Sequence, residues 1–316
     1  MTDPVIQNLQ RDFQNGTLPR NDYWKAIQQH HLLVDQYRHL IRGDLLDHIE
    51  IHAEHLLVVL KNGLRFIWDP TQTRQASSVL VNNGDYESDE LYTLLDIAQG
   101  CKTILDVGAN IGWYTLHLAQ IVGERGGVVH AFEPIPNTYA ELQRNLTLNP
   151  DAAAHIKTYP LALGETTQTV EFYIPAFQGS VAASRSALFP DDENIVVEGE
   201  MMPLDIFAER ETITGVDLLK CDVEGAEIFV LRGGPKLIER DKPILMLEML
   251  RKWAAKFDYH PDDMINLLAG YGYRCWYTGE DGRLNHLPKM HEGVMETNFF
   301  FLHDEKHADL IAAKSV

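Results

Sequence analysis

From about residue 100 onward, short apolar runs alternate with amphipathic stretches such as Trp113–Val122 and Thr138–Leu148. The apolar runs that contain β-branched residues are Thr103–Val107, Val128–Phe132, Thr158–Leu163, Val216–Asp222 and Pro243–Met249. Apolar strands separated by helices are typical of a parallel sheet that is covered on both faces. The pattern therefore predicts an α/β fold. The carboxyl ends of its strands share one edge, and ligands bind at that edge.

Two later segments depart from this alternation. Tyr273–Thr278 and Thr297–Leu302 have the pattern of strands with only a loop between them, so we expect them to pair antiparallel. Residues 175–203 are the most irregular part of the sequence and contain several glycines and serines. Because binding residues are often carried by loops, residues 175–203 are a candidate substrate loop.

The first quarter of the chain has a different pattern. Residues 1 to about 45 are predicted to be helical, and His48–Leu60 and Leu64–Trp68 form a predicted hairpin around an Asn-Gly turn. We therefore divide the chain into an N-terminal helical and hairpin extension, residues 1–75, and a main domain, residues 76–316. The extension is interpreted as a lid or a dimerisation element, and its amphipathic helices make a homodimer plausible.

The charge balance limits the classes of partner. Among 316 residues, 46 are acidic and 27 are Lys or Arg, which gives a formal net charge of −19. Binding to a phosphate backbone requires clustered basic residues, and the sequence has no dense basic run. We therefore predict no nucleic-acid partner and favour a neutral or cationic small-molecule acceptor.

Other features of the sequence indicate a compartment. The three cysteines show no CxxC spacing, which favours a reducing environment. The N-terminus is polar and lacks the apolar segment of a signal peptide. No stretch approaches the roughly 20 apolar residues that a membrane span requires. The sequence-based prediction is a cytoplasmic protein without a membrane partner.

A cofactor signature lies where the first apolar strand of the main domain ends. Asp106 is near the end of this strand, and the loop that follows carries Gly108, Asn110 and Gly112. The glycines allow a sharp turn and a close approach to a ligand. Asp106 could accept a hydrogen bond from the ammonium of a bound amino acid, and Glu133, at the tip of the second strand, could bind two ribose hydroxyls.

Two cofactor classes compete for this signature. A dinucleotide site requires G-x-G-x-x-G, but Asn110 and Trp113 occupy the second and third glycine positions and would obstruct a pyrophosphate. S-Adenosylmethionine has no phosphate and tolerates both residues, so we predict this methyl donor as the cofactor. A non-catalytic Rossmann-like fold with a tight strand-to-helix turn is the remaining alternative.

Acidic residues follow the fourth and fifth predicted strands. Asp222, Glu224 and Glu248 are the candidate catalytic residues, because methyl transfer to a hydroxyl requires an aligned acceptor and a proton acceptor. No metal is predicted, but the same three carboxylates are the candidate ligands if a divalent cation is used. The alternative is that Asp222 or Glu224 caps the next helix, in which Glu227 is interpreted as a first-turn acid.

Several motifs resemble the FkbM family of methyltransferases. They are GDYESDEL, DVGANIGWYTLHLA, VVHAFEPIPNTYAELQRNL, VDLLKCDVEGAEIFVLRGG, KPILMLEM and TNFFFL, and together they extend over roughly residues 80–302. The resemblance implies a Rossmann-like, seven-stranded class I methyltransferase sheet whose last strand is antiparallel. It also implies methyl transfer, usually to an oxygen of a sugar, polyketide or other specialised metabolite, while some relatives methylate peptide nitrogen.

The resemblance also implies further cofactor contacts. Glu87 would face the methionine end of S-adenosylmethionine, and we favour this role over the alternative of a solvated turn acid before a helix that starts at Ser88. Ala162 and Leu163 would lie against the adenine. Among the histidines, His286 and His291 are alternative catalytic candidates.

Three functional hypotheses follow. The first is a small-molecule O-methyltransferase that uses Asp222, Glu224 or Glu248. The second is an N-methyltransferase that acts on a peptide side chain or an amine, with the N-terminal extension holding the peptide. The third is a catalytically silent scaffold that keeps the fold and binds a partner.

Overall fold

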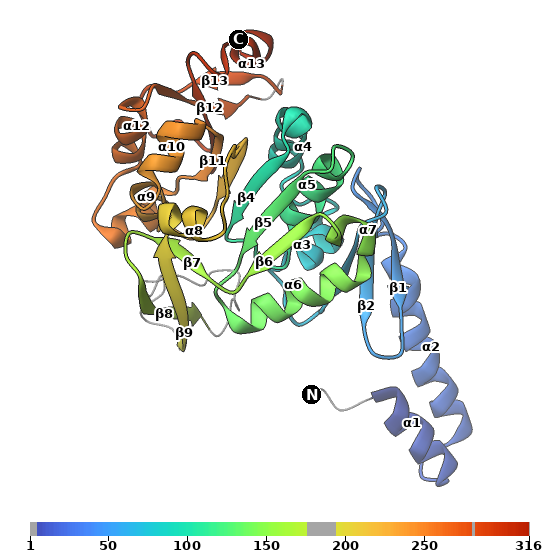
Figure 1. The fold of residues 1–316 in the computed structure, drawn as a ribbon. Coiled ribbons are helices and arrows are strands. Elements are labelled where there is room, and N and C mark those ends of the chain that lie inside the picture. The colour runs from blue at the N-terminus through green and yellow to red at the C-terminus, as the bar shows by residue number, and fades with distance from the viewer. Residues whose placement is uncertain (1–4, 176–193, 280–281, 316) are drawn as a thin grey trace.

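The computed structural model describes residues 5–175, 194–279 and 282–315. Its centre is an eight-stranded sheet with the order β13-β12-β14-β11-β10-β4-β5-β6 (Figure 1). The strands are β4 Thr103–Val107, β5 Val128–Phe132, β6 Ile156–Tyr159, β10 Leu218–Cys221, β11 Ile244–Glu248, β12 Tyr273–Thr278, β13 Leu284–His286 and β14 Asn298–His303. Strands β6, β5, β4, β10 and β11 are parallel, and β14 runs antiparallel between β11 and β12.

Helices cover both faces of the sheet. The helices are α3 Ala76–Asn83, α4 Ser88–Ile97, α5 Trp113–Gly123, α6 Pro136–Leu148, α7 Pro150–Ala153, α8 Leu204–Arg210, α9 Glu227–Arg232, α10 Pro235–Asp241, α11 Arg251–Ala254, α12 Pro261–Ala269 and α13 Ala308–Lys314, with short 3-10 helices at Ala98–Gly100 and Ala255–Phe257. Alternate residues of one strand enter different cores. Ile104 packs with residues of α3 to α5, whereas Leu105 packs with residues of α8, α9, α10 and α12. The predicted doubly covered α/β sheet is confirmed.

The seven-stranded arrangement with an antiparallel last strand is also confirmed, with one addition. The segment between β12 and β14 is not only a loop, because Leu284–His286 forms β13 and pairs with β12 at the edge of the sheet. The eighth strand is this short edge strand.

The third predicted strand, Thr158–Leu163, is wrong as a single element. The chain leaves the central sheet after β6 at Pro160, which has no N–H to donate to a sheet ladder. It then enters a second sheet of order β7-β9-β8, made of β7 Ala162–Gly164, β8 Gln168–Pro175 and β9 Asn194–Pro203.

The candidate substrate loop, residues 175–203, is also partly wrong. Its last ten residues form β9, which pairs antiparallel with β8 over the whole length of β8. The remainder of that loop, residues 176–193, lies outside the described residues.

The predicted hairpin near the N-terminus is a three-stranded meander, not two strands. The chain turns between His52 and His55, where the backbone N–H of His52 donates to the carbonyl of His55. The strands are β1 Leu46–Ile51, β2 Leu56–Leu60 and β3 Arg65–Trp68, paired antiparallel in the order β1-β2-β3.

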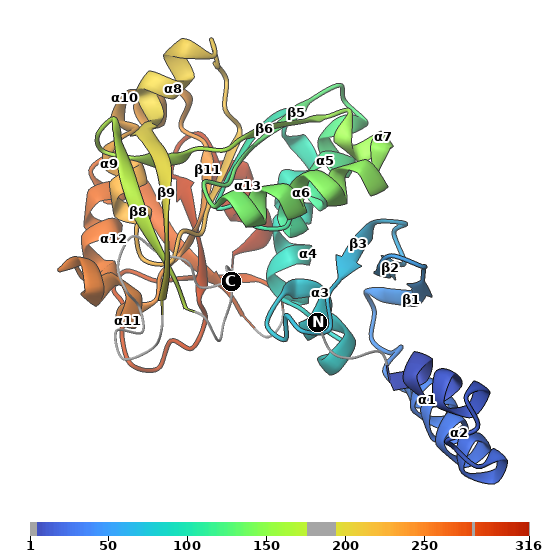
Figure 2. The ribbon, with the colours of Figure 1, turned by 90° about the horizontal axis from the view of Figure 1, so that it is seen from below.

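Two helices precede the meander and project from the rest of the molecule (Figure 2). They are α1 Val5–Gln14, which has no buried residue, and α2 Arg20–Tyr37, in which Ile27 alone is buried. Trp24 and Leu33 of α2 are more than half exposed. The predicted lid or dimer contact of this extension stays a prediction. In the described part of the chain no helix combines the length and apolar character needed to cross a membrane.

The meander shares a core with the main sheet. Phe66 of β3 is fully buried in the same cluster as Ile104 of β4 and Trp113 of α5. Two asparagine side chains bind the free edge of β3. Asn145 of α6 accepts a hydrogen bond from the Ile67 N–H at 2.9 Å and donates to the Ile111 carbonyl at 2.8 Å.

The second asparagine continues this edge. The side chain of Asn149 accepts a bond from the Arg65 N–H at 2.9 Å and donates to the Arg65 carbonyl at 2.7 Å. The two amides therefore satisfy backbone groups as a neighbouring strand would. Through its bond to the Ile111 carbonyl, Asn145 also joins the meander to the loop that follows β4.

We expect Asn145→Leu to lower the free energy of unfolding by about 2–4 kcal/mol, because it leaves the half-buried Ile67 N–H and the buried Ile111 C=O without partners. Arg144→Ala on the same helix, where the side chain is 60% exposed, should change it by less than about 0.5 kcal/mol. Urea denaturation measures both values. Equal effects of the two variants would contradict the role assigned to Asn145.

Candidate functional site

A pocket lies at the carboxyl ends of β4, β5, β10 and β11, as the parallel sheet predicts. The predicted site residues that line it are Glu87, Gly108, Asn110, Glu133, Ala162, Leu163, Asp222, Glu224 and Glu248. Asp106 and Gly112 are not among the lining residues. The structure therefore brings together residues that span more than 160 positions of the chain.

The loop after β4 has a backbone that its glycines make possible. Gly108 has φ = 82°, and a Cβ at this position would overlap the carbonyl oxygen of Asp222. Asn110 also has a positive φ of 49°, and its side chain accepts a bond from the Ile111 N–H at 2.8 Å. Gly112 has φ = 91° and packs against Leu142, so it serves the start of α5 rather than the pocket surface.

Glu133 fixes the loop after β4 to the loop after β5. Its Oε2 accepts a hydrogen bond from the Asn110 N–H at 3.0 Å, and its Oε1 accepts one from the Ile135 N–H at 2.9 Å. The residue is 5% exposed, and burial raises the pKa of its carboxyl group to about 7. Each carboxylate oxygen retains a further lone pair, so Glu133 could accept two more hydrogen bonds from a ligand.

Asp106 lies deeper than predicted. It is fully buried and accepts a bond from the Thr115 hydroxyl at 2.5 Å. Its other oxygen, Oδ1, is 3.7 Å from Nζ of Lys220. Lys220 lines the pocket and Asp106 does not, so any ligand ammonium that Asp106 binds would have to compete with this lysine.

Lys220 was missed by the sequence analysis. Its side chain is 3% exposed, lies 3.4 Å from Asp222 Oδ2, and has its ammonium 4.8 Å from the centroid of the Tyr114 ring. A charged residue inside the otherwise apolar run Leu218–Cys221 was the available signal, because lysine is rarely buried without partners. Its partner Asp106 is adjacent only in the folded sheet.

Glu87 is not a solvated turn acid, which was the alternative left open by the sequence. It is half-buried, lines the pocket, and accepts a hydrogen bond from the Tyr114 hydroxyl at 2.8 Å. Burial, and then the charge of Asp222, raise the pKa of Glu87 above its usual value. Its φ of 49° at the N-cap of α4 turns the chain into the helix that starts at Ser88.

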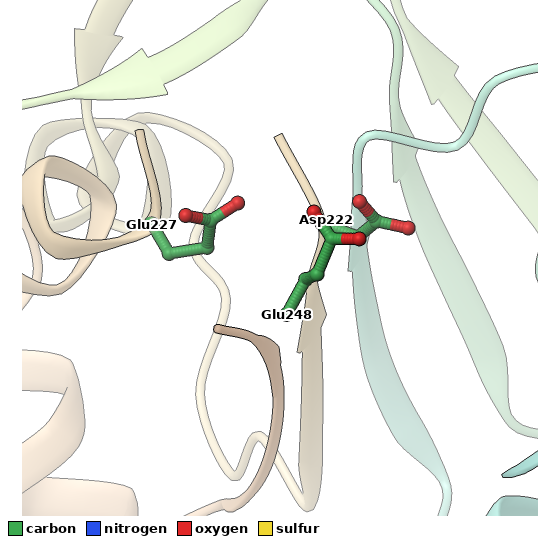
Figure 3. A group of neighbouring side chains, drawn as sticks. All are labelled: Asp222, Glu227 and Glu248. Carbon is green, nitrogen blue, oxygen red and sulfur yellow. The ribbon is translucent and has the colours of Figure 1, made fainter. Parts of the chain in front are cut away.

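The acids after β10 and β11 form a group that differs from the predicted set. One carboxylate oxygen from each of Asp222, Glu227 and Glu248 lies within 4.8 Å of the other two (Figure 3). These residues come from the ends of β10 and β11 and the start of α9. Glu224 lines the pocket but is not part of this group, and its φ is 54°. Ala226, not Asp222 or Glu224, is the N-cap of α9.

Glu227 has a structural explanation. It is the first residue of α9, as the sequence predicts, and it is 1% exposed. Its Oε1 accepts bonds from the N–H groups of Val223 at 2.9 Å and Gly225 at 3.2 Å, and its Oε2 accepts one from the Tyr259 hydroxyl at 3.3 Å. These bonds hold the loop that carries Asp222 and Glu224.

Glu248 has one oxygen that the protein does not satisfy. Its Oε2 is buried and has no hydrogen-bond partner in the described part of the chain. Burial, together with the charges of Asp222 and Glu224, raises the pKa of Glu248 well above its usual value. The alternative candidates His286 and His291 do not line the pocket, and His286 lies in edge strand β13.

The fold and site define a class I methyltransferase. This class depends on three features: a sheet in which antiparallel β14 lies between β11 and β12, the glycine loop after β4, and the acid after β5. Residues 106–275, more than half of the chain, match the Methyltransferase FkbM domain. The chain belongs to this family of S-adenosylmethionine-dependent enzymes, which confirms the predicted class and cofactor.

Similar proteins share only part of this chain. Methyltransferase sdnD of Sordaria araneosa is 30% identical over an alignment of 161 residues, and the match covers 41% of this chain and 59% of that protein. The 31-O-demethyl-FK506 methyltransferase FkbM of Streptomyces tacrolimicus is 29% identical over 41% of this chain and 58% of its own length. The matches thus extend over less than two thirds of these relatives.

A solved structure is also similar. The crystal structure of Methyltransferase FkbM from Methylobacillus flagellatus KT is 20% identical and matches 64% of this chain and 43% of that one, with a TM-score of 0.39.

We expect Gly108→Ala to lower the free energy of unfolding by about 2–5 kcal/mol, because the new methyl group meets the Asp222 carbonyl in addition to the strain of a positive φ. Gly126→Ala is the matched control. Gly126 also has a positive φ, but a Cβ there has open space, so the loss should be about 1–2 kcal/mol. Chemical denaturation compares them, and equal losses would show that the close approach of Gly108 to Asp222 is unimportant.

Proposed function

We propose that this protein transfers a methyl group from S-adenosylmethionine to a hydroxyl group of a small molecule. The observation that carries this proposal is the buried, unsatisfied Glu248 carboxylate beside Asp222, at the strand ends where the cofactor pocket lies. The relative from Streptomyces tacrolimicus is a 31-O-demethyl-FK506 methyltransferase, which supports an oxygen acceptor. The net charge of −19 supports an acceptor other than a nucleic acid.

The residues of the pocket fit the cofactor. Glu133 has the free lone pairs to bind the two ribose hydroxyls, and Gly108 lines the pocket without a side chain that could block a ligand. Ala162 and Leu163, the first residues of β7, offer an apolar surface for the adenine. Glu87 and Asp222 supply negative charge for the methionine ammonium and the sulfonium.

When bound, S-adenosylmethionine supplies a methyl group on a positively charged sulfur. The protein must hold the acceptor oxygen in line with that methyl group and remove the hydroxyl proton. We assign proton removal to Glu248, because its buried Oε2 has no partner in the described part of the chain and faces the pocket, and because a raised pKa makes its carboxylate a stronger base. Asp222 and Glu224 would orient the acceptor by accepting hydrogen bonds.

A divalent cation is not needed in this proposal. Glu227, which replaces Glu224 in the group of three close carboxylates, already accepts three hydrogen bonds from the protein. Its position is therefore explained without a metal ion.

The cofactor site predicts a pH-dependent affinity. Protonation of Glu133, whose pKa is about 7, turns a hydrogen-bond acceptor into a donor, so the affinity for S-adenosylhomocysteine should fall as the pH is lowered from about 8 to about 6. Glu133→Gln should weaken binding by roughly 10- to 100-fold at pH 8 and reduce this pH dependence. Isothermal titration calorimetry measures both.

Glu124→Gln is the control for that experiment, because Glu124 is exposed at the end of α5. It should leave the affinity and its pH profile as in the wild type. Glu133→Gln binding with wild-type affinity at pH 8 would contradict the role of this carboxylate.

The proposed function is tested with a library of hydroxyl compounds and S-adenosylmethionine. The wild type should add the mass of one methylene to an alcohol or phenol, detected by mass spectrometry. With that acceptor, Glu248→Gln should lower kcat by roughly 100-fold or more, because it removes the base, while the affinity for S-adenosylhomocysteine should change by less than about threefold. EDTA should leave turnover unchanged.

Glu292→Gln, an exposed acid outside the pocket, is the matched control and should keep wild-type turnover. Methylation of amines but not of hydroxyl compounds would contradict the oxygen acceptor. Loss of turnover in EDTA that Mg²⁺ restores would contradict the metal-independent proposal.

A further inference from the structure

Lys220 is a buried cation in a pocket that otherwise collects acids. Among the described residues that line this pocket, it is the one Lys or Arg, whereas Glu87, Glu133, Asp222, Glu224 and Glu248 are all acidic. The position of its side chain is set by the sheet, because Lys220 of β10 lies opposite Asp106 of β4 in the parallel register. Neither strand can change this juxtaposition without breaking the register.

The ammonium of Lys220 is charged but is not closely bonded. Burial alone would lower its pKa, but the charges of Asp222 and Asp106 outweigh burial and hold the pKa above its usual value. Its Nζ is 3.4 Å from Asp222 and 3.7 Å from Asp106. Both distances exceed the roughly 2.7–2.9 Å of a strong charge-assisted hydrogen bond. An ammonium has three N–H donors, so Lys220 has donor capacity for a ligand.

The ligand chemistry that matches this arrangement is a zwitterionic amino acid. The methionine end of the cofactor has an ammonium, which the acids Glu87 and Asp222 can bind, and a carboxylate, which those same acids repel. A carboxylate in this pocket is therefore favourable only beside a fixed positive charge. Tyr114, which contacts Lys220 through its ring and Glu87 through its hydroxyl, places the two charges side by side.

We propose that Lys220 donates a charge-assisted hydrogen bond to the carboxylate of the methionine moiety and so gives the site its preference for the amino-acid half of the cofactor. This inference rests on the proposed placement of the cofactor. Lys220 is a binding residue in this role and takes no part in proton removal.

The test compares S-adenosylhomocysteine with its decarboxylated analogue, which keeps the nucleoside, the sulfur and the amine. Calorimetry of the wild type should give a preference of roughly 10- to 100-fold for S-adenosylhomocysteine. Lys220→Met alone would leave Asp106 buried without its counter-ion and so destabilise the protein strongly. The informative variant is therefore the double variant Lys220→Met, Asp106→Asn, in which both members of the pair are neutral.

In the double variant, the affinities for the two ligands should become equal within about threefold, since the carboxylate no longer contributes a charged hydrogen bond. Asp106→Asn alone is the matched control. It retains Lys220, and its ratio of the two affinities should therefore remain that of the wild type, even if both affinities change. A purely structural role of Lys220 would change both affinities by the same factor and leave the ratio intact.

Two results would overturn the inference while leaving the proposed function in place. One is a wild type that binds both ligands equally, a measurement that does not depend on how any variant folds. The other is a double variant that keeps the wild-type preference. A wild type that binds neither ligand would overturn the proposed cofactor site itself, and the inference with it.

Discussion

The close parallel pairing of β4 and β10 constrains the rest of the site. It places Asp106 beside Lys220 on one face of the sheet and brings the loop at Gly108 against the carbonyl of Asp222. Because a Cβ at Gly108 does not fit there, the glycine loop and the acidic loop pack directly against each other. The cofactor end and the acceptor end of the pocket are thus parts of one packing arrangement.

Burying charged carboxylates in the pocket costs free energy, and a positively charged ligand would offset this cost. Burial raises the pKa of Glu133 to about 7 and the pKa values of Glu224 and Glu248 well above their usual range. A sulfonium has the charge that would relieve this cost, whereas a pyrophosphate would increase it. The electrostatics of the site therefore agree with the choice between cofactors made from Asn110 and Trp113.

Much of this fold could be predicted from sequence because buried parallel strands are continuous apolar runs, and β4 and β5 begin and end as expected. Relations across strands could not be predicted. The partner of Lys220 is more than 100 residues away in sequence, and the close group of acids includes Glu227 instead of Glu224, whose φ is positive. Pro160, by contrast, was a readable signal for the end of β6.

The central claim is that a nucleoside joined to an amino acid binds at the ends of β4, β5 and β10. A crystal structure of the protein with S-adenosylhomocysteine tests it most directly. We expect both ribose hydroxyls to donate hydrogen bonds to Glu133 and the adenine to lie against Leu163. Electron density that places the nucleoside outside this pocket, or its ribose away from Glu133, would contradict the account.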